Sequence, residues 1–276
     1  MTSFQKVIKY CATAFAIFLI VTIIGGAVTA LLAISGVHSL KTEIKENKAE
    51  FSELKEYTLK SDEIDKLDID VGAVDIIIEK GNSFTVKYSG INFDIDEEKN
   101  KLEIENDSDS IFGFDAVGKL LITVPDKMSF EKVSLCAGAG DIYIESLNCG
   151  SLDLDLGAGE VEIDYLRVKR DANIDGGAGE LTISDGTINN PDISLGVGQT
   201  SITALLKGKS TVEAGVGELS LTLKGDKASY AVSAETGIGD FRVDGERVSD
   251  GDVIGSGESL VEIEGGIGLV RVEFAA

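Results

Sequence analysis

Residues 157–163 read GAGEVEI, and this pattern of glycine, small apolar residue, glycine and then usually an acid occurs six more times. The other copies are CAGAGDIYI (136–144), GGAGELTIS (176–184), LGVGQTSIT (195–203), AGVGELSLT (214–222), TGIGDFRVD (236–244) and GGIGLVRVE (265–273). The first glycines of successive copies are 19, 20, 19, 19, 22 and 29 residues apart. A period near 20 that is held over five copies and then lengthened by insertions indicates a stacked repeat architecture.

One repeat, SLDLDLGAGEVEIDYLRV (151–168), shows what the glycines do. Its leucines alternate with aspartates, as in a strand with one wet face, but the next apolar pair, Val161 and Ile163, is out of phase with Ala158. We therefore expect G-x-G to be a corner whose central Ala, Val or Ile points into the core. The predicted corner glycines are Gly138, Gly140, Gly157, Gly159, Gly177, Gly179, Gly196, Gly198, Gly215, Gly217, Gly237, Gly239, Gly266 and Gly268.

Two short strands and a bend in every 19–20 residues favour an all-β fold, a parallel β-helix over residues 61–276. About ten turns at ~4.8 Å would give a rod of ~50 Å. Residues 67–79 resemble a degenerate first turn, 90–118 a polar, irregular insertion, and 120–125 a return to the pattern. An antiparallel β-sandwich is the alternative, although hairpins do not require a constant period.

The N-terminal region contains 28 residues without a charge, 10–37, which is long enough for a transmembrane helix. Lys6 and Lys9 precede this run, so the positive-inside rule places residues 1–9 in the cytoplasm and the rest of the chain outside. The predicted partner of residues 10–37 is thus the lipid bilayer of the cell membrane. Secretion after cleavage of a signal peptide, near Ala33-Ile34-Ser35, is the alternative.

Residues 38–60 are charged with sparse apolar positions, which predicts a helical stalk or linker.

The composition argues against several function classes. A formal net charge of −23 disfavours nucleic acid as a partner. The one histidine, His38, lies at the end of the apolar run, so no His-dependent catalytic unit is expected in the exported part. We predict that the protein is not an enzyme and has no cofactor.

Cys136 and Cys149 are expected to be buried or idle thiols, with a bridge between them as the alternative.

An acid usually follows each corner, and stacked turns would align these residues in one outward column. The positions are Asp141, Glu160, Glu180, Gln199, Glu218, Asp240 and Leu269. Unit charges at this spacing repel by only about 0.9 kcal/mol in water, so the column needs no ion. The alternative to a column of solvated charges is weak Ca²⁺ binding between Glu160 and Glu180, but Gln199 and Leu269 interrupt the column. We therefore predict no metal site.

The combination of an N-terminal anchor, LDIDVGAVDI, LLITVPDKMSFEKVSLCAGAGDIYIESL and the following G-x-G-[DE] repeats resembles the bacterial β-strand-repeat families of unknown function labelled "putative adhesins". The resemblance covers roughly residues 64–274, and the last copy departs from it at Leu269. It implies an envelope-located, non-enzymatic β-helix, sometimes associated with membrane-stress systems.

The function expected from these features is a membrane-anchored adhesion or binding module that contacts an envelope protein or a glycan. The alternative is a structural or regulatory envelope protein that partners with a membrane stress-response system or associates with itself through the ends of the solenoid.

Overall fold

The computed structural model describes residues 54–60, 63–106 and 118–275, all of which belong to one compact unit, 47–276. The predicted anchor at 10–37 and most of the predicted stalk lie outside the described residues. Within the described part, no helix is both long and apolar enough to cross a membrane.

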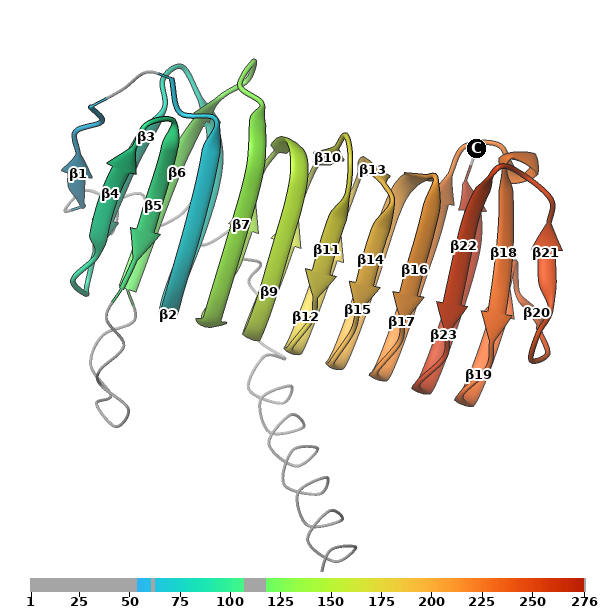
Figure 1. Cartoon of the computed structure of the whole chain (residues 1–276). Coiled ribbons are helices and arrows are strands. Elements are labelled where there is room, and N and C mark those ends of the chain that lie inside the picture. Colours follow the sequence, from blue (N-terminus) through green and yellow to red (C-terminus); the bar gives the residue numbers. More distant parts are fainter. Residues whose placement is uncertain (1–53, 61–62, 107–117, 276) are drawn as a thin grey trace, which may run out of the picture. The chain divides into compact units, whose positions relative to one another are not determined.

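The described chain is almost entirely β-strand, arranged as a solenoid with three faces (Figure 1). Face A contains β4 (Asp94–Glu98), β5 (Lys101–Glu105), the start of β2 (Lys66–Gly81), β7 (Phe130–Ala139), the middle of β9 (Leu147–Ile163), β11 (Ala172–Asp175), β14 (Pro191–Ser194), β16 (Lys209–Glu213), β22 (Ser259–Glu264), β18 (Tyr230–Glu235) and β21 (Val253–Gly255).

Face B follows each corner. It contains β1 (Lys55–Tyr57), β3 (Thr85–Ser89), β6 (Gly118–Pro125), the end of β2, β8 (Ile142–Ile144), the end of β9, β12 (Ala178–Ile183), β15 (Val197–Lys207), β17 (Val216–Lys224), β23 (Ile267–Ala275), β19 (Ile238–Val243) and β20 (Glu246–Arg247). Face C is shorter, with the start of β9, β10 (Leu166–Val168), β13 (Gly186–Asn189) and the end of β15. One short 3-10 helix, η2 (Lys227–Ser229), precedes β18.

Parallel pairing between successive turns holds the solenoid together. On face A, Leu154 of β9 pairs with Ile174 of β11, and Ile174 pairs with Ile193 of β14. These three side chains are at most 2% exposed and form one column of the core. Because each residue lies beside its counterpart one repeat later, inward side chains meet inward side chains at every level. The parallel ladders confirm the expected solenoid and rule out the antiparallel sandwich.

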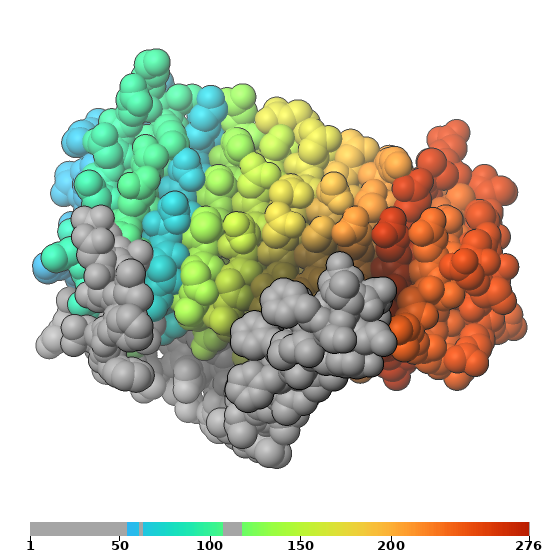
Figure 2. All heavy atoms as spheres, turned by 60° about the horizontal axis from the view of Figure 1, so that its bottom comes forward, coloured from blue at the N-terminus to red at the C-terminus, as the bar shows by residue number. Residues whose placement is uncertain are grey.

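The order of turns in space differs from their order in the sequence at both ends (Figures 1 and 2). At the N-terminal end, β2 lies between β5 and β6 on one side and β7 and β8 on the other. At the C-terminal end, β23 lies between β17 and β19, and β22 lies between β16 and β18. The last turn of the sequence is therefore an inner turn of the solenoid. The two longest intervals between corner glycines, 22 and 29 residues, occur where the order of turns in space differs from the order in the sequence.

Short antiparallel strands cover both ends. β4 pairs with β5 and β3 pairs with β6 at one end, while β21 pairs with β18 and β20 with β19 at the other. β20 and β21 have only 2 and 3 residues. Edges this short offer few free backbone groups to another chain.

Two expectations about local structure are corrected. Lys55–Tyr57, in the predicted helical stalk, is strand β1 and pairs with β3, because Tyr57 and the nearby Leu59 pack against the core. Residues 94–105, in the predicted irregular insertion, are the hairpin β4–β5, and its Leu102 and Ile104 are fully buried. Charged residues dominate this segment, and the alternation of its few apolar residues is therefore difficult to recognise in the sequence.

Candidate functional site: the glycine corner and its flanking columns

The predicted corner glycines all lie at the bend between face A and face B. The second glycine of each corner has a positive φ, for example +146° at Gly159. The first glycine has no such dihedral, but a Cβ atom on Gly157 would be 1.9 Å from the carbonyl oxygen of Gly138 in the neighbouring turn. A distance this short cannot be tolerated between atoms that are not bonded. The second position therefore needs glycine for its φ and for close backbone approach, and the first needs it for close approach, except at Gly138, where a Cβ atom would be 3.2 Å from its nearest neighbour.

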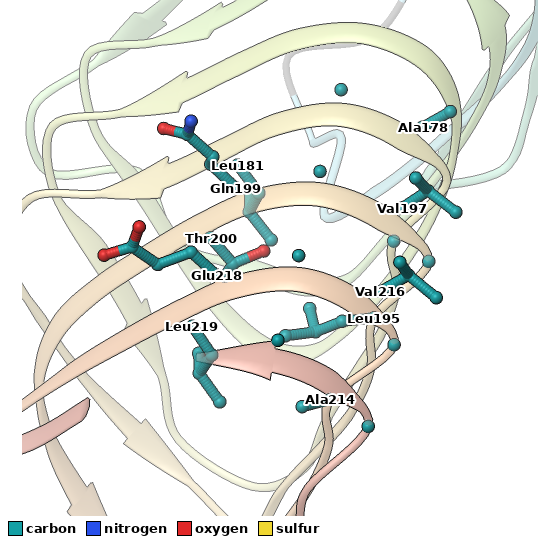
Figure 3. A pocket seen from close by; sticks show the side chains of 18 of the residues that line it. Ala178, Leu181, Leu195, Val197, Gln199, Thr200, Ala214, Val216, Glu218 and Leu219 are labelled. Atoms are coloured by element: carbon teal, nitrogen blue, oxygen red, sulfur yellow. The ribbon is translucent and has the colours of Figure 1, made fainter. Parts of the chain in front are cut away.

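The central residue of each corner points outward, contrary to the expectation from the sequence. Ala158 and Ala178 are exposed, and Ile238 is 73% exposed. Figure 3 shows Val197 and Val216 on the outer side of the bend, with Leu195 and Leu219 on the inner side. The parity argument failed because Cβ atoms on the two glycines would point along the solenoid axis, toward a neighbouring turn, as from Gly177 to Gly157. The bend therefore places the residue between them at its outer apex.

These central residues form a continuous outward column, which we call the corner ridge. Direct pairing joins Ala73 to Ala139, Ala139 to Ala158, and so on to the last level. In spatial order the corner ridge is Ala73, Ala139, Ala158, Ala178, Val197, Val216, Ile267 and Ile238. The repeats in the sequence show which residues belong to this column. Only the structure shows that Ile267 lies between Val216 and Ile238.

The acid column predicted beside the corner is outward and in register. Glu160 pairs with Glu180, Glu180 with Gln199, and Gln199 with Glu218. The Asp141 carboxylate accepts a hydrogen bond from the Glu160 backbone N–H at 3.0 Å. Partial burial, followed by the charges of Glu180, Asp141 and Glu162, raises the pKa of Glu160. These neighbouring carboxylates thus disfavour ionisation of Glu160.

The far end of the acid column has a different character. Leu269 replaces the acid there and lies between Glu218 and Asp240. The Asp240 carboxylate contacts the Arg242 guanidinium at 2.6 Å and the Arg247 guanidinium at 3.1 Å. The hydrogen bond from Arg242 is the main cause that lowers the pKa of Asp240. At this end of face B the arginines form ion pairs with the acids Asp240 and Glu218, whereas the carboxylates near Glu160 adjoin one another.

A narrow cavity of ≈ 70 Å³ lies along the corners. Figure 3 shows Leu181, Leu195 and Leu219 turned toward it, together with Ala214. Glycine or alanine takes the place of leucine at the position before the corner in some turns, as at Gly176 and Ala214, and this leaves space beneath the bend. The described lining is mostly apolar, so the cavity is a packing gap and provides no cluster of polar groups for chemistry.

Face A carries further carboxylates on its outer side. Asp155 pairs with Asp175 of the next turn, and Asp155 also pairs with Cys136. Burial, with smaller effects from Asp70 and Asp155, raises the pKa of the Cys136 thiol. Burial likewise raises the pKa of the Cys149 thiol to about 12. Both thiols are free, and Cys149 points into the core while Cys136 faces outward, so the bridge considered as an alternative does not form.

Among the described residues, no group of three or more His, Cys, Asp or Glu side chains has the geometry to hold a metal ion. The outward side chains instead form parallel columns that run the length of the solenoid. Such columns provide an extended surface, and their residues do not converge on one point.

One of the solved structures that are similar to this chain shares its fold. A crystal structure of a "putative adhesin" from Bacteroides fragilis is 19% identical, with a TM-score of 0.52, and covers 80% of this chain and 97% of that one. A "putative cell adhesion protein" from Clostridium sporogenes is 17% identical, with a TM-score of 0.38, over 81% of this chain and 99% of that one. Among curated protein sequences none matches this chain.

The match to a protein family covers the N-terminal cap of the solenoid and most of its turns. Residues 64–253 match the Toastrack DUF4097 family. This range is more than half of the 276 residues. The chain therefore belongs to the Toastrack DUF4097 family.

Proposed function

We propose that this protein is a membrane-anchored, non-enzymatic binding module of the bacterial cell envelope, with the solenoid outside the cytoplasmic membrane. The observation that carries the proposal is the set of parallel outward columns on faces A and B. A solenoid presents its side chains at a repeat of ~4.8 Å over its whole length, which suits an extended partner such as an envelope protein or a glycan. The uncharged run at 10–37 supports anchoring.

The outer columns of face A are the best candidate contact surface. One column includes Asp155, Asp175, Glu213, Glu264 and Glu235, joined by direct pairing through Ser194. Carboxylates in such a row attract positively charged groups of a partner and guide its approach. We expect binding to depend on salt concentration for this reason.

Binding of the exported part to isolated native envelopes tests the proposal. The bait begins at residue 47, because β1 at Lys55–Tyr57 belongs to the sheet. We expect saturable binding that weakens at least tenfold when Asp153, Asp155 and Asp175 are all replaced by Asn. The matched control replaces three exposed acids outside these columns, Glu246, Glu258 and Glu273, by Gln.

Pretreatment of the envelopes with a protease or with glycan-degrading enzymes separates the two kinds of partner. Absence of saturable binding to untreated envelopes would contradict the binding function. Protease treatment of intact protoplasts tests the location separately, since an exported solenoid is accessible and a cytoplasmic one is protected.

A further inference from the structure

Face C differs in charge from the other two faces. Its strands and the residues that lead from them into face A, 147–151, 166–171, 186–190 and 205–209, contain five basic residues and one acid, Asp171. The whole chain has 48 acids against 25 lysines and arginines, so this part of the surface has the opposite balance. In Figure 1 the junction of faces C and A is the upper rim of the solenoid, opposite the glycine corners.

In the part of the chain that the structure describes, four exposed basic residues of this region form no ion pair with a carboxylate. They are Arg167, Lys169, Arg170 and Lys207, and we call them the basic edge. The fifth, Lys209, pairs with Glu262 at 3.0 Å. The charges of the basic edge are therefore not neutralised within the described protein and are available to an external anion.

Neutral groups hold two of these cations in place. The Lys169 ammonium donates a hydrogen bond to the Ser129 hydroxyl at 2.9 Å. The Arg170 guanidinium donates to the Ser151 hydroxyl at 3.2 Å and to the Glu131 backbone carbonyl at 2.9 Å. These oxygens orient the side chains without cancelling their charge, and the guanidinium has further N–H groups for a ligand.

Gly150 and Asn190 position Arg170 from either side. A Cβ atom on Gly150 would be 2.8 Å from the Cζ and Nη2 atoms of Arg170, so glycine makes room for the guanidinium. The Asn190 amide donates to the Arg170 backbone carbonyl at 3.1 Å, and its oxygen accepts from the Lys209 backbone N–H at 3.2 Å. Arg170 is thus ordered before a ligand arrives, which lowers the entropy cost of binding.

The spacing of the basic edge suits a row of anionic groups and not one small anion. Arg167 and Lys169 are two residues apart along the chain, about 7 Å. The Asn189 amide donates to the Lys169 carbonyl, and Asn189 pairs with Lys207, so the two lysines are two turns apart, about 10 Å. A single carboxylate or phosphate is too small to contact all three cations.

We propose that the basic edge binds an anionic polysaccharide, a chain that carries carboxylate or phosphate groups among its hydroxyls. Lysine and arginine bind either anion. Arg167 pairs with Asn148 on one side and Thr187 on the other, so amide and hydroxyl groups suited to sugar hydroxyls lie beside the cations. The inference goes beyond the proposed function, because it concerns a different surface from face A and a ligand of opposite charge.

Two other anionic partners agree less well with the structure. A flat anionic membrane would also approach the acids of the neighbouring faces, and the net charge of −23 opposes this. An acidic peptide usually needs a free strand edge or apolar pockets, but β10 and β13 are paired on both sides. A narrow polysaccharide contacts the basic edge alone, and salt screens acids more than about 8 Å away.

Binding of the full chain, in a neutral detergent, to polysaccharides of known charge tests the proposal. We expect saturable binding to polygalacturonate or to phosphorylated dextran, and none to uncharged dextran. The affinity should fall about tenfold between about 50 and about 200 mM NaCl, as for about three charge contacts. Poly-L-glutamate or phosphatidylglycerol vesicles that bind as tightly as the charged polysaccharides would overturn the assignment, as would no binding to either charged polysaccharide.

Variants of the basic edge locate the site. Replacement of Lys169, Arg170 and Lys207 by Gln should weaken binding at least tenfold without changing the melting temperature. Lys207→Glu alone, at an exposed side chain, should weaken it at least threefold. Lys169→Arg together with Lys207→Arg should retain binding, because both charges remain.

The matched control replaces three exposed basic residues outside the basic edge, Lys55, Lys80 and Arg247, by Gln. It should bind like the parent protein, and an equal loss in this control would overturn the site. The variant with three aspartates of face A replaced should bind the polysaccharide at least as tightly as the parent protein. Failure of one contact surface is therefore distinguishable from failure of the other.

Discussion

Single atoms decide the identity of the corner residues. At Gly177 a Cβ atom would lie 1.7 Å from the carbonyl oxygen of Gly157 and 2.1 Å from that of Leu156. Both contacts are to backbone, which cannot move aside without separating two turns of the ladder. One residue later, the Ala178 side chain points into solvent at the apex of the bend. Neighbouring positions in the same corner therefore differ completely in the substitutions they tolerate.

Gly177→Ala should consequently destabilise the fold by about 3 kcal/mol or more, even though it adds only one methyl group. Ala178→Val is the matched control and should change the stability by no more than about 0.5 kcal/mol, because Val197 and Val216 already occupy this column. Chemical denaturation of both variants measures the difference. Equal stability of Gly177→Ala and the parent protein would refute the close-approach argument.

The pH dependence of stability tests the role of a second single residue, Glu160. Its pKa is raised in the folded protein by burial and by neighbouring carboxylates, so folding favours its protonated form. Its contribution is therefore most favourable below the ordinary pKa of glutamate and is lost as the pH rises through the raised value. Glu160→Gln should stabilise the protein at pH 7 by up to about 1 kcal/mol, reduced by solvent screening.

This gain from Glu160→Gln should disappear when the melting temperature is measured below the ordinary pKa of glutamate. Glu258→Gln, at an exposed position before β22, is the control and should show no such trend. A gain for Glu160→Gln that is the same at pH 7 and at low pH would show that charge is not its cause.

At the level of whole strands, pairing partners are set by position in the stack and not by order in the chain. β23 is the last strand of the sequence, yet it pairs with β17 on one side and β19 on the other. Its Val270 and Val272 belong to the core. β2 has the corresponding place at the opposite end, between β6 and β8. β2 and β23 are thus both inner strands of the stack, each with a turn on either side.

Removal of residues 267–276 tests this arrangement. In a solenoid stacked in chain order, the loss of the last strand would leave the preceding turns paired. Here β19 loses its parallel partner, so its amides should exchange hydrogen at least a hundredfold faster, while amides of β9 and β11 remain protected. Retained protection of β19 in the truncated chain would contradict the exchanged order.

The molecule as a whole has a formal net charge of −23, so the carboxylates in the columns of both faces repel one another. Ion pairs such as Lys132–Asp153 at 2.7 Å offset part of this repulsion, but both side chains are about half exposed. Stability should therefore rise with salt through screening, and the cation should have little influence at fixed ionic strength.

We accordingly expect NaCl and millimolar CaCl2 to raise the melting temperature equally when their ionic strengths match. Glu160 and Glu180 are adjacent in the acid column and are the pair most suited to Ca²⁺. Calorimetric titration should detect no stoichiometric binding at micromolar Ca²⁺. Binding that is lost when both residues are replaced by Gln would reveal a specific site.

Much of the fold and part of the candidate site could be predicted from local patterns. Alternation in SLDLDL predicted a one-sided strand, and Leu152 and Leu154 are indeed buried. The outward acid column also followed from the period, because equal repeats must stack in register. The direction of Ala158 was predicted incorrectly, since alternation applies to extended backbone and fails at a bend whose glycines have no side chains.

The sequence by itself determined the repeat, the parallel stacking and the positions that need glycine, because each of these depends on interactions between residues that are close in the chain or one period apart. Only the tertiary structure decided that β23 lies inside the stack and that the hairpin β4–β5 covers one end. It also decided the order of Ile267 and Ile238 on the corner ridge. Parallel ladders of similar length are nearly equivalent in local energy, so the choice among them depends on how all the turns and caps pack together.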